Sequence, residues 1–225
     1  MDKKYYSEYL VEIIRKCIAK KVRKYDFDNQ NGIFTFEMEV QDKPDNLEYL
    51  IKVGNGDYVI NVISPLMADT RDKKMMSALA EFVCRINYCM EEGNFDLNMS
   101  GGIIQFKYYM NCMHITPPER IVEHSIMRPI DMFRQYSKGF VRIIGGNYNA
   151  RKAAEACETA YIVKILNDYK RETAYDAEDY YYDADEEIGI NIDMDFDDNY
   201  YYEDKDVDRY FEWFGLWEKD GKERE

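Results

Sequence analysis

The chain has 225 residues and a formal net charge of −14, and this charge is distributed unevenly. Residues 1–171 carry 25 basic and 23 acidic residues, whereas residues 172–225 carry 5 basic and 21 acidic residues. The first segment is long enough to bury a hydrophobic core. No stretch approaches the ~20 apolar residues of a membrane span, and charges interrupt every apolar run near the N-terminus. We therefore expect a cytoplasmic protein with one folded domain, residues 1–171, and an acidic, tyrosine-rich tail, residues 172–225.

The first predicted element is an amphipathic helix over residues 4–24. Leu10, Ile14 and Ile18 recur at helical spacing on one face. The second half of the helix is basic. Such a run is typical of a solvated face, and the alternative is a docking surface for an acidic partner. The cations that would form this surface are Lys16, Lys20, Lys21, Arg23 and Lys24.

Three strands are predicted next, between residues 33 and 63. Phe34 and Phe36 alternate with polar residues, which is the pattern of a strand with one buried face. Two further alternating runs flank Asn55-Gly56. This pair favours a hairpin with a type I′ turn, which needs positive φ at both central residues. We expect Pro65 to end the meander.

A helix and a hairpin follow between residues 70 and 112. The helix is predicted over residues 70–91 by an apolar stripe at spacings of three and four. Two alternating segments then predict two strands, joined by a turn at Gly101-Gly102. The stripe consists of Met75, Leu79, Phe82, Val83, Ile86 and Met90, and we interpret Asn87, Gly93, Asn94 and Gly101 as helix-stop and turn residues.

A long helix is predicted after the hairpin. It begins at Thr116-Pro117-Pro118-Glu119, which has the spacing of a capping box with proline at the first helical positions. It is expected to kink or break at Pro129 and to end at Gly145-Gly146.

The last helix of the predicted domain covers about residues 150–170 and is capped by Asn147 or Asn149. The elements then follow in the order α-β-β-β-α-β-β-α-α, with short connections between strands. This order predicts an α+β fold, in which helices cover one face of a mainly antiparallel sheet.

Helical and strand periodicity is lost in the tail. Clustered carboxylates repel one another, so we expect residues 172–225 to be disordered for the most part. The exception is residues 205–218, where the spacing of apolar residues predicts a short amphipathic helix. This helix would dock either on the chain's own core or on a partner. Its apolar residues at helical spacing are Val207, Tyr210, Phe211, Phe214 and Trp217.

Few residues in the sequence suggest catalysis or metal binding. The five cysteines are odd in number and scattered, which favours free thiols in a reducing compartment. Cys112 and His114 supply two ligands where zinc needs four, and Asp193, Asp195 and Asp197 begin a calcium-loop pattern that lacks its turn glycine. The sequence has no glycine-rich phosphate loop or nucleophile elbow. We predict no metal, no cofactor and no enzymatic activity.

Short motifs in the central stretch are similar to those of a known family. A helix ending in asparagine, a Gly-Asn-Phe entry into a strand, and a late helix with a glycine stop resemble the YbjN family of bacterial sensory transduction regulators. The residues that carry this resemblance are Phe82-Val-Cys-Arg-Ile-Asn87, Gly93-Asn-Phe-Asp-Leu97, Gly102-Ile-Ile-Gln-Phe106, Phe140-Val-Arg-Ile-Ile-Gly-Gly146 and Ala150-Arg-Lys-Ala-Ala154.

The resemblance implies a type III secretion chaperone-like fold, often found as a homodimer. It also implies a non-enzymatic role in regulation or in holding partner polypeptides, and it brings no catalytic residues. In this hypothesis the acidic tail shields the basic helix face until a protein partner displaces it. A second hypothesis is that the tail imitates nucleic-acid charge and binds basic nucleic-acid-binding proteins. Direct binding to nucleic acid or membrane is not expected.

Overall fold

Residues 5–39, 46–88 and 90–176 are described by a computed structural model, with side chains described as far as residue 167. The chain divides into two units, Met1–Glu158 and Thr159–Glu225. The boundary at residue 171, derived from composition, stays a prediction. In the described ranges, no helix is both long enough and apolar enough to cross a bilayer.

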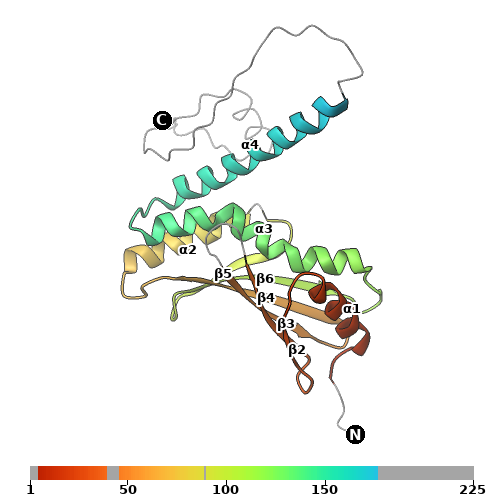
Figure 1. Ribbon diagram of the computed structural model, residues 1–225. Coiled ribbons are helices and arrows are strands. Elements are labelled where there is room, and N and C mark those ends of the chain that lie inside the picture. The colour runs from red at the N-terminus through yellow and green to blue at the C-terminus, as the bar shows by residue number, and fades with distance from the viewer. Residues whose placement is uncertain (1–4, 40–45, 89, 177–225) are drawn as a thin grey trace, which may run out of the picture. The chain divides into compact units, whose positions relative to one another are not determined.

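A six-stranded antiparallel sheet forms the centre of the first unit (Figure 1). The strands lie in the order β1-β2-β3-β4-β6-β5, so β6 is between β4 and β5. The predicted meander and hairpin are both present, and the α+β class is confirmed. The strands are β1 (Asp26–Asp28), β2 (Ile33–Glu39), β3 (Asn46–Val53), β4 (Asp57–Met67), β5 (Asn94–Asn98) and β6 (Ile103–Asn111).

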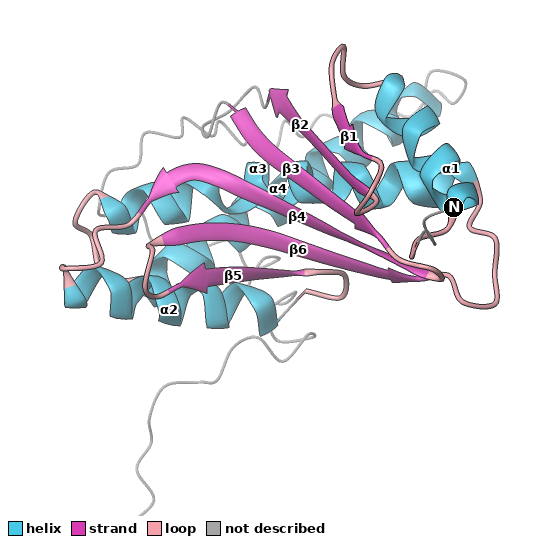
Figure 2. Cartoon of the chain, turned by 90° about the horizontal axis from the view of Figure 1, so that it is seen from below, coloured by secondary structure: helices cyan, strands magenta, loops and turns pink. Residues whose placement is uncertain are grey.

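Helices cover one face of this sheet, and in the described part of the first unit the opposite face carries none (Figure 2). A fourth helix begins in the first unit and continues in the second. The covering helices are α1 (Glu8–Ala19), α2 (Lys73–Tyr88) and α3 (Glu119–Ile144), and the fourth is α4 (Ala150–Asp176).

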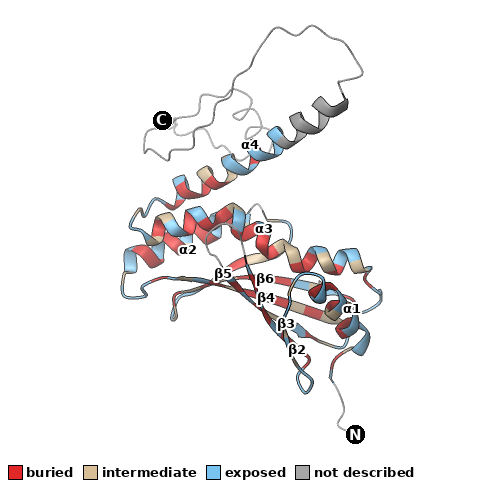
Figure 3. Cartoon of the chain, viewed as in Figure 1, coloured by how far each residue is buried: buried red, intermediate tan, exposed pale blue. Residues whose placement is uncertain are grey.

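The core lies between the sheet and these helices (Figure 3). Alternate residues of each strand are buried, as the period of two requires. Phe95 on β5 is at the centre of an aromatic cluster, with ring-centroid distances of 5.0 Å to Phe106, 5.1 Å to Phe133 and 5.2 Å to Phe140. Edge-to-face contacts of this kind stabilise a core beyond the area they bury.

Two buried tyrosines attach α3 to the sheet near Pro129. The hydroxyl of Tyr49 on β3 donates to the carbonyl oxygen of Ile126 at 3.1 Å. The hydroxyl of Tyr58 on β4 lies 2.7 Å from Oγ of Ser125. A proline inside a helix removes a main-chain donor and disturbs the preceding turn. Pro129 nevertheless lies inside one continuous helix, so the predicted break is absent.

The beginning of α2 is joined to the segment that follows α3. Asp72 Oδ1 accepts from the main-chain N–H groups of Lys74 and Met75, both at 3.0 Å. Its other oxygen accepts a 2.7 Å hydrogen bond from the hydroxyl of Tyr148. Asp72 therefore caps one helix and holds the approach to α4 in place.

The first helix is shorter than the predicted range of residues 4–24. Oγ of Ser7 caps it by accepting from the N–H of Leu10 at 3.3 Å, and the helix ends at Ala19. The additional strand β1 follows and pairs with β2. Its one aromatic residue, Phe27, has its ring centroid 4.4 Å from that of Phe34. The sequence Asp-Phe-Asp is too short for the strand pattern to be recognised.

Two predictions about the meander were wrong. Strand β4 does not end at Pro65 but continues to Met67, with an irregular register after Ile63. Proline is tolerated there because an irregular pairing does not need its missing N–H. The turn between β3 and β4 is also not type I′, since Asn55 and Gly56 lack positive φ. It closes instead through a 2.9 Å hydrogen bond from the Gly54 N–H to the Asp57 carbonyl.

Of the predicted helix ends, the N-terminal cap of α3 is absent, whereas the C-terminal stop of α3 and the N-terminal cap of α4 are confirmed. The capping box at Thr116 is absent, because Pro118 occupies the N-cap position of α3 and no side chain caps it. The cap of α4 is confirmed at Asn149, whose Oδ1 accepts from the N–H of Lys152 at 3.0 Å. The predicted glycine stop of α3 is also confirmed, with Gly146 at φ +102°.

One edge of the sheet is only partly covered. Strand β1 pairs with Ile33–Thr35, so Phe36–Glu39 of β2 have β3 as their one neighbour among the described strands. Glu37 lies directly opposite Glu48 on the face without helices. Charged residues at an exposed strand edge hinder pairing with another chain.

Candidate binding surface at the α1–α3 end

The C-terminal half of α1 lies beside the first turn of α3. The thiol of Cys17 donates to the main-chain oxygen of Glu119 at 3.7 Å. Ile18 and Val122 are fully buried from the two helices. Burial of the apolar face of α1 therefore leaves its lysines on the outer side, where their charges stay hydrated.

Two of the predicted cations form ion pairs with α3. Lys20 pairs with Glu119 and has Oε2 of Glu123 at 4.0 Å, while Lys21 lies 2.8 Å from Oε1 of Glu123. The hydrogen bond to Glu119 raises the pKa of Lys20, and the one from Lys21 lowers the pKa of Glu123. Exposed pairs of this kind contribute little stability. They orient the two helix ends and neutralise two charges.

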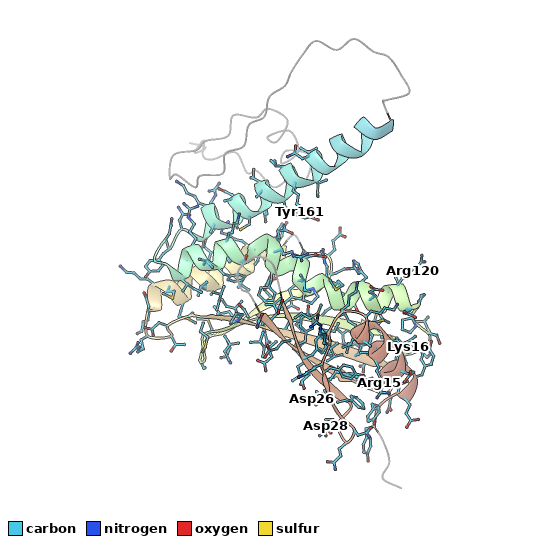
Figure 4. The ribbon with its side chains drawn as sticks, in the orientation of Figure 1. Arg15, Lys16, Asp26, Asp28, Arg120 and Tyr161 are labelled. Atoms are coloured by element: carbon cyan, nitrogen blue, oxygen red, sulfur yellow. The ribbon has the colours of Figure 1, made fainter. Side chains whose placement is uncertain are left out.

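The other three predicted cations, Lys16, Arg23 and Lys24, are exposed and have no ion pair within the described residues. Arg120 adds a fourth exposed cation from the first turn of α3. Lys16 and Arg120 lie at the same end of the first unit (Figure 4). We call the surface formed by Lys16, Lys20, Lys21, Arg23, Lys24 and Arg120 the basic end.

Sequence reasoning missed Arg120 because it is isolated from the basic run by about a hundred residues. Its position directly after Thr116-Pro117-Pro118-Glu119 was a usable signal. A charged side chain in the first turn of a helix is almost never fully buried unless it is paired. The sequence does not indicate which other element packs beside the N-terminal turn of α3.

Exposed apolar side chains adjoin the basic end. Met113 and Ile115 precede α3 and have exposed fractions of 68% and 63%, and Ile121 in its first turn has 39%. Single exposed apolar residues are normal on protein surfaces. Three of them lie within nine residues around the start of α3, which also carries Arg120, so this end of the helix combines apolar and basic side chains.

Arg15 has a structural role. Its guanidinium lies 3.1 Å from Oε2 of Glu12 and 5.3 Å from the ring centroid of Phe27. A cation over an aromatic face is attracted to the ring electrons. Arg15 therefore helps to hold β1 against α1 and is not part of the basic end.

A smaller polar cluster lies near the end of α2. Glu92 Oε2 is 3.8 Å from Nδ1 of His124 and 4.0 Å from Nε of Arg128. The Arg128 Nε atom is buried without a hydrogen-bond partner. These contacts are long for ion pairs, and Glu92 lies within 4.0 Å of both side chains.

The remaining sequence predictions concern metal sites, thiols and the tail. Within residues 5–39, 46–88 and 90–176 no group of three or more ligand-type side chains could hold a metal ion. Cys17, Cys84, Cys112 and Cys157 are free thiols. The partner-binding candidates Tyr210, Phe211, Phe214 and Trp217 lie outside the described residues, as do Asp193, Asp195 and Asp197.

The geometry of the basic end suits the binding of anionic groups. Its side chains are lysines and arginines, which donate hydrogen bonds and attract negative charge. No protein-family model matches the chain, and no curated protein matches it. The resemblance to the YbjN family and the role it implies therefore remain predictions.

Proposed function

We propose that the chain is a non-enzymatic, cytoplasmic protein that binds other polypeptides in a regulatory or chaperone-like role, of the kind that the resemblance to YbjN implies. The partner-binding surface in this proposal is the basic end. A homodimer is part of the proposal. Light scattering of the purified chain at several concentrations would test it.

One observation carries this proposal. Lys20 and Lys21 are neutralised within the fold, but Lys16, Arg23 and Lys24 are exposed without an anionic partner in the described ranges. A cluster of unpaired like charges adds nothing to the stability of the fold. It does raise the local concentration of an oppositely charged partner and speeds encounter with it.

Capture from cell extract with two charge-matched variants tests the proposal. K16E/K24E reverses two cations of the basic end, and K52E/K107E reverses two exposed lysines on the sheet face that carries no helix. Both variants change the net charge equally. A captured protein would then be purified and its affinity measured at two salt concentrations.

We expect K16E/K24E to weaken that affinity by about tenfold or more, which corresponds to about 1.4 kcal/mol, and the salt dependence to become shallower. K52E/K107E should retain the affinity. Equal loss in both variants, or no loss in either, would contradict the proposed surface.

The second hypothesis rests on the acidity of residues 172–225, which carry 21 acidic and 5 basic residues. A chain that ends at residue 176 keeps α4 and removes most of this charge. If the captured proteins are basic, bind nucleic acid and are lost on truncation, the charge-mimicry hypothesis is favoured. In that case the basic end is not the partner-binding surface.

A further inference from the structure

We propose that the basic end recognises one class of polypeptide, an acidic segment that also carries aromatic or aliphatic side chains. This inference rests on the proposed function and specifies the chemistry of the partner. It follows from two features of the α1–α3 end, unpaired cations and exposed apolar side chains. Arg120 and Ile121 bring the two together as consecutive residues in the first turn of α3.

The cations set the charge of the partner and the spacing of that charge. Glu119 and Glu123 lie among the basic residues and neutralise Lys20 and Lys21. The unpaired positive charge is therefore divided between Lys16 on α1, Arg120 on α3 and the residues that follow α1. Divided charge suits a polypeptide whose carboxylates are separated by other side chains.

The apolar residues set the second requirement. Met113 and Ile115 are each about two-thirds exposed, and Ile121 is more than one-third exposed. A partner that covers them gains about 25 cal/mol for each Å² of apolar surface removed from water. An acidic segment without apolar side chains would leave these residues in water, so it should bind more weakly.

The same surface is a poor match for the two other anionic partners. Nucleic acids and acidic membranes present closely spaced negative charge, and binding strength follows the number of phosphates neutralised. Lys20 and Lys21 are already paired with Glu119 and Glu123, so they cannot neutralise phosphates without breaking these ion pairs. A polypeptide can instead place neutral or apolar residues opposite the two glutamates.

Residues 200–218 of the chain itself provide a probe with the required chemistry. This segment contains six acidic and two basic residues together with Tyr210, Phe211, Phe214 and Trp217. Both tryptophans of the chain lie within it. A chain that ends at residue 176 therefore contains no tryptophan, and the fluorescence of a synthetic 200–218 peptide reports its own binding.

The experiment titrates this peptide with the chain ending at residue 176, which retains the whole described core of the first unit. We expect saturable binding with a blue shift of the tryptophan emission. K16E/K24E should weaken it by about tenfold, and K52E/K107E should leave it unchanged. I115S/I121S should also weaken it without any change in charge. A fluorescently labelled peptide and the full-length chain repeat the measurement by anisotropy.

Three results would overturn the inference. The first is no binding of the peptide to either chain. The second is equal binding by a peptide of the same charge in which serine replaces every aromatic residue, because charge alone would then explain the affinity. The third is that phosphatidylserine vesicles or single-stranded DNA bind through Lys16 and Lys24 while the peptide does not.

Failure of this inference is distinguishable from failure of the proposed function. If a protein captured from extract depends on Lys16 and Lys24 but the peptide does not bind, the proposed function stands and the partner chemistry is wrong. If the captured protein is also insensitive to K16E/K24E, both are wrong.

Discussion

Asn87 and Phe95 exchange two hydrogen bonds, each 2.8 Å long. The Asn87 Oδ1 accepts from the main-chain N–H of Phe95, and the Asn87 Nδ2 donates to its carbonyl oxygen. The side-chain amide thus pairs with β5 as a neighbouring strand would. It joins the last turn of α2 to an edge strand whose central ring lies in the aromatic cluster.

Replacing Asn87 should destabilise the first unit. N87A leaves a main-chain donor and acceptor of Phe95 without partners, and each unsatisfied group of this kind costs about 1–3 kcal/mol when it is buried. Phe95 is buried, but the Asn87 side chain is half-buried at this edge, so water can reach part of the vacated space. We therefore expect a total loss of about 1–3 kcal/mol in the free energy of unfolding. Urea denaturation measures it.

Two comparisons make this test specific. N87D keeps the acceptor but replaces the donor with a carboxylate oxygen, so it should not restore stability. N46A removes an exposed amide at the start of β3 and should change the unfolding free energy by less than about 0.5 kcal/mol. A stability of N87A equal to that of N46A would show that water replaces the Asn87 amide without cost.

Gly139 on α3 should not tolerate a methyl group. A Cβ atom there would lie 2.6 Å from Cε2 of Phe82 and 3.1 Å from Sγ of Cys157. Alanine improves helix propensity by about 0.5–1 kcal/mol, but overpacking in a filled core costs about 1–3 kcal/mol. We expect G139A to lower the melting temperature. Q135A, on a partly exposed position of the same helix, serves as the control.

Glu37 and Glu48 offer a stabilising change. They are directly opposite each other on β2 and β3, and like charges in this position are unfavourable. E48K should raise the unfolding free energy by up to about 1 kcal/mol at low salt. The gain should shrink as salt screens the pair. A gain that is independent of salt would indicate another cause.

The described thiols should react at very different rates. Burial, followed by the nearby Glu119 carboxylate, raises the pKa of Cys17 to about 11, and burial raises that of Cys157 to about 11. At pH 8 a thiol with this pKa is ionised in roughly one molecule per thousand, and the thiolate is the reactive form. Cys84 is exposed.

Among the described thiols, iodoacetamide at pH 8 should therefore modify Cys84 first, and peptide mapping by mass spectrometry identifies the site. Cys17 and Cys157 should react after urea unfolds the chain, because unfolding returns their pKa to its ordinary value. Raising the pH toward 11 should speed their modification in the folded state if the fold survives. Fast labelling of Cys17 at pH 8 would contradict its burial.

Much of the fold could be predicted because its signals are local. Alternating residues such as Phe34 and Phe36 predict a strand from a few neighbouring positions. The failures involve signals that depend on distant partners. Pro65 is tolerated because β4 pairs irregularly with β6 there. Asn87 does lie at the end of α2, as predicted, but its sequence position does not indicate that its amide also bonds Phe95.

The candidate surface was predictable only in part. The basic run of α1 is visible in the sequence, but the pairing of Lys20 with Glu119 joins residues 99 positions apart. No periodicity in α1 indicates that α3 will neutralise two of its lysines and add Arg120. The exposed state of Ile115 and Ile121 likewise depends on where the end of α3 lies.

The partial coverage of β2 has a consequence for assembly. The uncovered stretch of β2 carries Glu37 and Glu39, while at the other edge the Asn87 side chain bonds the main-chain N–H and carbonyl groups of Phe95 on β5. Sheet growth from copy to copy needs two matching free edges. With carboxylates on one edge and the main-chain groups of Phe95 already bonded on the other, edge-to-edge pairing between copies is hindered on both sides. Growth through strand edges is thus limited even though, among the described elements of the first unit, no helix covers the other face of the sheet.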